Sequence, residues 1–176
     1  MLNMAPMNFG GLNQDDQKAY AKLGATLHCL FHKPLVNTSF AVPMSIASTG
    51  GWEQEWRLDT AGAPLQSHFT LALRENIVAG QRIWSWRLLV SNGTESDALW
   101  TDVTALAVDT YRAGGGSDEQ LAVSIGFRRM FPNMSLPMPA THMKLVATNT
   151  TNASHAPALR DVAIYDWSAR VSEKCF

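Results

Sequence analysis

Two glutamates placed two positions apart, Glu53 and Glu55, are the residues whose type and spacing best fit acid–base chemistry. In an extended strand, side chains at positions i and i+2 project from the same face, so the two carboxylates would lie together. A retaining glycosidase needs two carboxylates about 5 Å apart across its sugar. A third acid at i+5 would complete a glycan-hydrolysing strand, but that position is Leu58. We therefore expect a solvated charged face here, with glycan hydrolysis as an alternative.

Tryptophan is the second residue type that could bind a ligand. The chain holds six: Trp52, Trp56, Trp84, Trp86, Trp100 and Trp167. An indole face can stack on the apolar face of a sugar ring, and Trp52 and Trp56 share one face of an expected strand. Most tryptophans of a β-sandwich fill its core or an interface instead. Core burial is therefore favoured, and sugar binding by Trp52 and Trp56 is an alternative.

Patterns for a metal, a cofactor or a nucleophile are incomplete in this sequence. His28 and His32 stand four positions apart on an expected helix, which lets two histidines reach one metal, but no third ligand is near. No serine lies in a Gly-x-Ser-x-Gly elbow, and the glycines at 114–116 do not precede the Lys-Ser/Thr of a phosphate loop. We predict no catalytic, cofactor or metal residues, and a structural or binding protein rather than an enzyme. A pair assembled from distant His and Asp residues would leave no local pattern.

One helix is expected near the N-terminus, over residues 15–31. Asn13 or Asp15 can cap its first turn, and Pro34 ends it. Its apolar residues recur at steps of three and four: Tyr20, Leu23, Leu27 and Leu30. The preceding uncharged segment is expected to be an arm that packs on something, through Leu2, Met4, Met7, Phe9 and Leu12.

From about Ser39 onward, apolar and polar residues alternate with the period of a strand. About eight strands are predicted: 39–48, 52–59, 69–74, 82–91, 99–112, 121–127, 142–148 and 159–171. The three-proline segment 130–139 is expected to be a loop. Without regular helices between strands, the pattern predicts an all-β antiparallel sandwich of the jelly-roll type. We expect an arm and short helix over 1–34 and a β-sandwich domain over 35–176.

Composition narrows the partners and the compartment. The 176 residues carry a net charge of −1, and the first 14 residues have no charged side chain. A basic excess that would displace counterions from nucleic acid is missing, so nucleic acid is not an expected partner. No secretory signal or membrane-spanning stretch is visible, and the two cysteines are interpreted as reduced thiols. Five Asn-x-Ser/Thr motifs are therefore interpreted as polar surface: Asn37, Asn92, Asn133, Asn149 and Asn152.

The C-terminal run Leu159-Arg-Asp-Val-Ala-Ile-Tyr-Asp-Trp-Ser-Ala-Arg-Val-Ser-Glu173 resembles the last strand of concanavalin-like and laminin-G-like sandwiches. Those sandwiches often end in Ile-Asp-Asp-Val-x-Ile-Tyr-Asp, followed by small residues and Ser-Glu. The resemblance implies a sandwich edge and carries over neither their calcium-binding nor their sugar-binding acids. The single β domain, uncharged arm, proline-rich loop and low charge also resemble the jelly-roll virion proteins of tailed phages.

The second resemblance implies a virion structural protein: a capsid decoration, minor capsid or tail-fibre subunit. Its partners would be copies of itself and other virion proteins, and it would be made in the host cytoplasm without a membrane or cofactor. A carbohydrate-binding, lectin-like module that holds a surface glycan is the first alternative. A jelly-roll glycan hydrolase is the second.

Overall fold

The computed structural model of the chain describes residues 13–31, 33–40, 42–47, 51–58, 64–66, 68–93, 99–107, 125–151 and 154–166. Over these residues the elements are a helix, nine strands and a short 3-10 helix. Their bounds are α1 Gln14–Phe31, β1 Val36–Ser39, β2 Ser45–Ile46, β3 Trp52–Arg57, β4 Phe69–Glu75, η1 Ile77–Ala79, β5 Ile83–Ser91, β6 Thr101–Asp102, β7 Arg129–Met134, β8 His142–Thr150 and β9 Leu159–Asp166. The expected arm residues Leu2, Met4, Met7, Phe9 and Leu12 lie outside the described residues.

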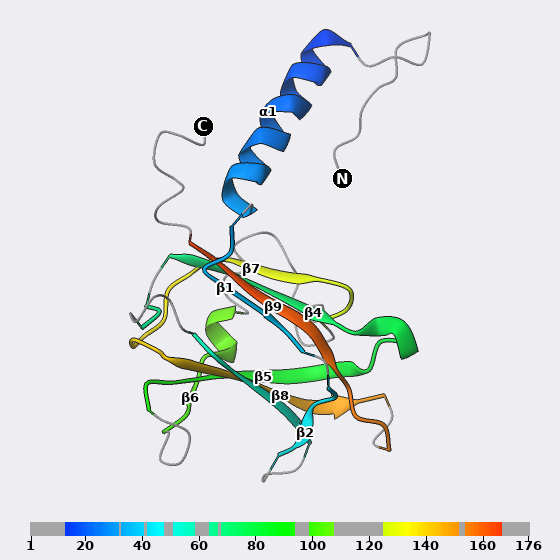
Figure 1. Ribbon diagram of the computed structural model, residues 1–176, viewed down its shortest axis with the longest axis vertical. Coiled ribbons are helices and arrows are strands. Elements are labelled where there is room, and N and C mark those ends of the chain that lie inside the picture. The colour runs from blue at the N-terminus through cyan, green and yellow to red at the C-terminus, as the bar shows by residue number, and fades with distance from the viewer. Residues whose placement is uncertain are drawn as a thin grey trace.

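The strands form two antiparallel sheets that pack as two layers. One sheet has four strands in the order β1-β9-β4-β7, and the other has five in the order β2-β3-β8-β5-β6. In Figure 1 the four-stranded sheet is the layer next to α1, and the five-stranded sheet is the layer farther from it. The predicted all-β antiparallel sandwich is confirmed.

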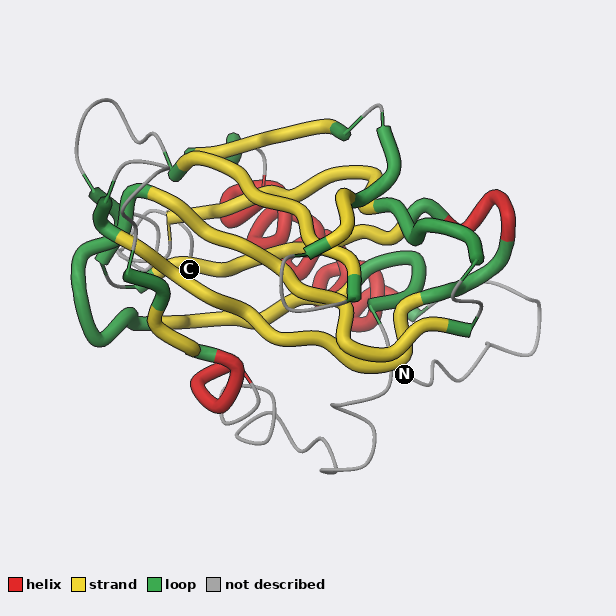
Figure 2. Tube along the Cα trace, turned by 90° about the horizontal axis from the view of Figure 1, so that it is seen from below, coloured by secondary structure: helices red, strands yellow, loops and turns green. Residues whose placement is uncertain are grey.

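The helix α1 begins and ends where the sequence predicts. The Asn13 side chain accepts a hydrogen bond from the Asp16 backbone amide at 2.8 Å, which is a helix N-cap. The helix stands away from the sandwich along most of its length (Figure 1), and Figure 2 shows it behind the strands when the molecule is seen from below. Its C-terminal end reaches the body, where the ring of Phe31 meets that of Tyr165 on β9 at 5.1 Å. In the described residues, no helix has the length and apolar character needed to cross a lipid bilayer.

The core lies between the sheets and follows the predicted alternation on β3. Trp56 is 4% exposed and Leu58 1%, whereas Glu53 and Glu55 are on the outer face. Large buried residues of the facing strands complete this core: Phe69, Leu71, Leu73, Leu88, Phe131, Met143, Leu145, Val162 and Ile164. The faces seen in the structure are therefore the ones that a period of two predicts.

Four predicted segments differ from the structure. Among the described residues of 39–48, Ser39 ends β1 and only Ser45–Ile46 form a further strand, β2. Residues 125–127, the described part of the predicted strand 121–127, are not in a strand.

Residues 129–134 form strand β7 instead of part of a surface loop, although Pro132 lies within it. The strand order puts β7 at the edge of its sheet, where a proline that lacks an N–H group is tolerated. Within 99–107, the described part of the predicted strand 99–112, only the two residues of β6 are in a strand, because Asp102 accepts hydrogen bonds from the Thr104 amide and hydroxyl at 2.9 and 2.6 Å. That cap starts a helical turn over 104–107.

The interpretation of the cysteines as reduced thiols is wrong for Cys29. This residue, in the last turns of α1, is disulfide-bonded. Cys175, the other cysteine of the sequence, lies outside the described residues. The presence of two cysteines in the sequence does not by itself reveal this disulfide bond.

Glu75, at the end of β4, is a buried acid with a structural role. Its Oε1 atom accepts hydrogen bonds from the backbone amides of Arg82 at 2.5 Å and Ile83 at 3.0 Å, which closes the loop around η1. Burial raises the pKa of Glu75 above 4.5, although the hydrogen bonds from Arg82 and Ile83 oppose that rise. The other oxygen, Oε2, has no hydrogen-bond partner among the described residues.

This raised pKa predicts a dependence of stability on pH. The folded protein holds the Glu75 proton more tightly than the unfolded chain does, so its contribution is complete below about pH 4.5 and is lost as pH rises through the folded-state pKa. Glu75→Gln keeps an acceptor oxygen but cannot ionise. We expect the stability of the glutamine variant relative to the wild type to increase with pH, measured by urea unfolding between about pH 4 and 7. A difference that stays constant over that range would contradict the assignment.

Candidate functional site

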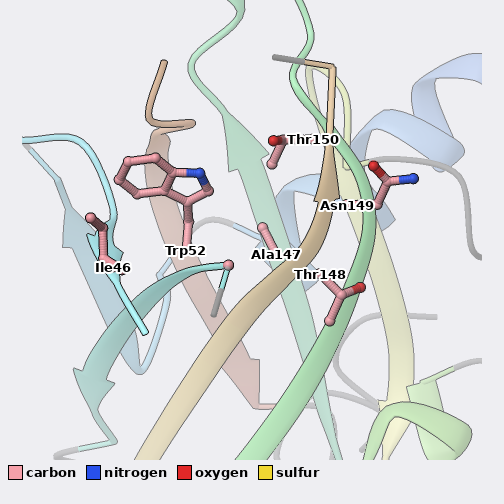
Figure 3. A pocket seen from close by; sticks show the side chains of 7 residues that line it. Ile46, Trp52, Ala147, Thr148, Asn149 and Thr150 are labelled. Atoms are coloured by element: carbon pink, nitrogen blue, oxygen red, sulfur yellow. The ribbon is translucent and has the colours of Figure 1, made fainter. Parts of the chain in front are cut away.

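A pocket of about 410 Å³ lies at one end of the five-stranded sheet. Its lining comes from β2, β3 and β8: Ile46, Gly51, Trp52, Ala147, Thr148, Asn149 and Thr150. Figure 3 shows the Trp52 indole standing between Ile46 on one side and the residues at the end of β8 on the other. We call this site the Trp52 pocket.

The pocket exists because β8 is longer than its neighbour β3. Pairing between the two strands stops at Trp52 and Ala147, so residues 148–150 extend beyond β3 while Asn149 and Thr150 still pair with β5 on the other side. Gly51 turns the chain away at this point with φ of +86°. A side chain there would bring its Cβ within 2.7 Å of the Ala147 carbonyl oxygen, so the close approach depends on glycine.

The structure separates the two tryptophans that the sequence places together. Trp56 is buried in the core, where its ring lies 6.3 Å from that of Phe40. Because it is buried, Trp56 is not available to stack on a sugar. Trp52, at the other end of β3, is half-buried: it packs against the core and also lines the pocket.

The pocket combines one aromatic ring with short polar side chains. Thr148 and Asn149 are exposed, and the Thr148 hydroxyl lies 2.7 Å from that of Ser85 on β5. Hydroxyl and amide groups can both donate and accept hydrogen bonds, and an indole presents a flat apolar face. This combination suits a ligand that has hydroxyl groups around an apolar face, which is the character of a saccharide ring.

Glu53 and Glu55 project from the outer face of the same sheet, next to Lys144 on β8. The Lys144 ammonium lies 3.6 Å from the Glu53 carboxylate and 3.4 Å from that of Glu55. The same ammonium lies 4.4 Å from the ring centre of Trp100, which is a cation–π contact. The two carboxylates do share a face, as the sequence predicts, but both are bound by one lysine that sequence spacing does not reveal.

A second ion pair continues this charged face on the neighbouring strands. The Arg87 guanidinium on β5 contacts Oδ2 of Asp102 at 2.7 and 2.8 Å. Burial acts to raise the pKa of Asp102, but hydrogen bonds from Thr104 and the contact with Arg87 outweigh it and lower that pKa. This ion pair joins β5 and β6 across the outer face.

Removing the Lys144 charge is expected to destabilise the fold more than removing an exposed lysine. Lys144 has a side chain only 14% exposed, and its two glutamates are 29% and 31% exposed. Exposed pairs contribute about 0–1 kcal/mol, whereas breaking a buried pair costs about 3–5 kcal/mol. We expect Lys144→Met to lower the free energy of unfolding by about 1–3 kcal/mol, measured by chemical denaturation.

Lys18→Met is the matched control, because Lys18 pairs with Asp15 at 3.7 Å on the exposed surface of α1. We expect a change below about 0.5 kcal/mol for that variant. Equal losses in the two variants would mean that the Glu53–Lys144–Glu55 cluster contributes no more than a surface pair.

The histidine pair of α1 is not assembled into a metal centre in the described part of the chain. His28 lies on the exposed helix, and His32 is outside the described residues. Among the residues whose placement is described, no group of three His, Cys, Asp or Glu side chains is placed to hold a metal ion.

The chain matches no protein-family model and no curated protein, but its fold occurs in solved structures. A putative alpha-L-fucosidase from Bacteroides thetaiotaomicron has 15% identity and a TM-score of 0.56, over 93% of this chain and 29% of that chain. A glycoside hydrolase 29 family member from an unknown rumen bacterium has 18% identity and a TM-score of 0.60, over 99% and 26%. A Ruminococcus gnavus GH29 fucosidase in complex with fucose has 14% identity and a TM-score of 0.56, over 98% and 34%.

These likenesses show the fold, and the chain spans about a quarter to a third of the length of those enzymes. They contradict the prediction of a structural or binding protein rather than an enzyme, because this β fold is found within glycoside-hydrolase chains. The virion interpretation finds no support among these neighbours. Glu53 and Glu55 suggested glycan hydrolysis, and Trp52 and Trp56 sugar binding, only as alternatives. No motif made either of them the first expectation, because sandwiches with the same layers can share a fold at low identity.

The sequence also missed most of the Trp52 pocket. Asn149 was visible as part of a polar motif, but its position beside Gly51 and Trp52 depends on how β3 and β8 pair. Lys144 and Trp100 lie 89 and 45 positions beyond Glu55, and no local spacing connects either of them with that residue.

Proposed function

We propose that this chain is a carbohydrate-binding β domain that works together with a glycoside hydrolase, and that it holds a saccharide in the Trp52 pocket. The observation that carries the proposal is the pocket itself, where an accessible indole lies beside the threonine and asparagine side chains of β8. The glycoside-hydrolase chains that share the fold supply the second support. Fucosylated oligosaccharides are the first ligands to test, because one of these neighbours holds fucose.

Binding of fucosylated and other oligosaccharides, measured by glycan array and then by calorimetry, tests the proposal. Trp52→Leu removes the flat ring but keeps an apolar side chain against the core, so the fold should survive. Losing the flat ring is expected to cost about 1–2 kcal/mol of binding free energy, which weakens binding about fivefold to thirtyfold. Asn149→Ala should weaken binding less, because it removes only hydrogen bonds.

Trp84→Ala is the matched control. Trp84 is another tryptophan of this sheet, with 41% of its surface exposed, and it does not line the Trp52 pocket. Its variant should bind as the wild type does. Absence of binding to any glycan on the array, or equal binding by Trp52→Leu and the wild type, would reject the Trp52 pocket as a saccharide site.

Hydrolysis of the saccharide is a second candidate function, favoured by the enzymes that share the fold. Glu53 and Glu55 are the carboxylates that would carry it, on the outer face where Lys144 binds both. Any turnover of aryl glycosides that persists in Glu53→Gln and in Glu55→Gln would reject this pair as catalytic residues. Turnover lost in both variants, with saccharide binding retained, would support it.

A further inference from the structure

Asparagines in this chain are concentrated in one motif. Five of its nine asparagines begin Asn-x-Ser/Thr with no proline between, which is the acceptor sequence for N-linked glycans. Serine and threonine make up about a seventh of the chain, so a random order would give about one such motif. A polar surface alone does not explain this excess.

Asparagines outside the motif have structural roles in the described residues. Asn13 caps α1 by accepting from the Asp16 amide at 2.8 Å, and Asn76 caps η1 by accepting from the Val78 amide at 3.3 Å. Their side chains are therefore explained by the fold itself.

Four of the five motif asparagines are described by the structure: Asn37, Asn92, Asn133 and Asn149. All four are exposed, and Asn152 lies outside the described residues. Asn133 uses its oxygen Oδ1 in a 3.3 Å contact with the His68 ring, and this contact does not involve Nδ2, the atom that would carry a glycan.

Three of these residues lie on an edge strand or in a turn. Asn37 is on β1 and Asn133 is on β7, the two edge strands of the four-stranded sheet. Asn92 lies in the turn that follows β5. Edges and turns give a branched oligosaccharide room without separating paired strands.

The disulfide at Cys29 indicates the compartment. Disulfides form and persist in oxidising environments such as the lumen of the endoplasmic reticulum, and they are rare in the cytosol. Glycan transfer to Asn-x-Ser/Thr takes place in that same lumen. The disulfide is an observation independent of the motifs, and it fits the oxidising compartment in which they are used.

We propose that the protein matures in an oxidising secretory compartment and carries N-linked glycans at Asn37, Asn92 and Asn133. In that transfer a bond forms between Nδ2 and C1 of the first sugar of a lipid-linked oligosaccharyl pyrophosphate. The bond from C1 to the pyrophosphate oxygen breaks, the lipid pyrophosphate leaves with its electron pair, and the amide gives up one proton. Asn149 is not included, because it lines the Trp52 pocket and a glycan there would fill it.

The experiment uses the full chain secreted from eukaryotic cells, with oxidation of Cys29 confirmed by peptide mapping. Peptide-N-glycosidase in ¹⁸O-water converts each glycosylated asparagine to ¹⁸O-labelled aspartate, which mass spectrometry locates. Most molecules should carry the label at each of the three sites. A predominantly unlabelled Asn37, Asn92 or Asn133 in the disulfide-bonded protein would overturn the assignment of that site, and three unlabelled sites would overturn the proposal.

Variants at one site separate glycan transfer from other effects. Thr94→Ser keeps the acceptor motif of Asn92 and should keep its glycan, whereas Thr94→Ala should lose it while Asn92 itself is unchanged. Asn76→Gln, outside any motif, should leave the glycan mass unchanged. A modification at Asn92 that survives Thr94→Ala would contradict N-linked transfer. These measurements do not depend on saccharide binding. This proposal can therefore fail while the proposed function holds, and the reverse.

Discussion

Replacing Trp56 with alanine is expected to lower the free energy of unfolding by about 3–5 kcal/mol. Trp56 is 4% exposed and fills the core between the sheets, so its removal leaves a large cavity that the paired strands cannot close. Urea unfolding of the variant and the wild type measures the difference. Trp84→Ala removes the same side chain from an exposed position and should cost less than about 1 kcal/mol.

Trp56→Phe refines this prediction. The Trp56 indole N–H has no hydrogen-bond partner among the described residues, so the larger ring carries an uncompensated buried donor. Phenylalanine keeps most of the packing and removes that donor, and we expect a loss well below that of Trp56→Ala. A loss in Trp56→Ala as small as that in Trp84→Ala would mean that Trp56 is not a core residue.

Gly51→Ala is expected to destabilise the fold and to weaken binding at the Trp52 pocket. The positive φ of +86° strains any residue with a side chain, which costs about 1–3 kcal/mol. The Cβ atom would also meet the Ala147 carbonyl oxygen at 2.7 Å, so β3 and β8 must move apart where they form the pocket. Thermal unfolding and saccharide calorimetry measure the two effects.

The same substitution in α1 should have the opposite sign. Gly24 lies inside the helix, and a Cβ atom there would meet nothing within 4 Å. Alanine is favoured over glycine in a helix by about 0.5–1 kcal/mol, so Gly24→Ala is expected to stabilise the protein. If both alanine variants changed stability by the same amount, the conformational requirement at Gly51 would be disproved.

The helix and the strands whose apolar residues recur at regular steps could be predicted from the sequence. The Asn13 cap and the apolar spacing that follows gave the helix, because those contacts are made within a few residues of each other. Alternation on β3 correctly separated Trp56 from Glu55, because successive strand side chains point to opposite faces in any sheet. β7 was missed because tolerance of Pro132 depends on its being at an edge, and strand order is a property of the sheet.

The sequence by itself determined a β-sandwich, one capped helix and a pair of glutamates on a shared face. Only the tertiary structure decided that Lys144 binds both glutamates, that Trp52 is accessible while Trp56 is buried, and that Cys29 is disulfide-bonded. The physical reason is the range of the interactions. Caps and alternation act between residues close along the chain, whereas the pocket and the charged cluster depend on where β8 pairs with β3, about ninety residues away.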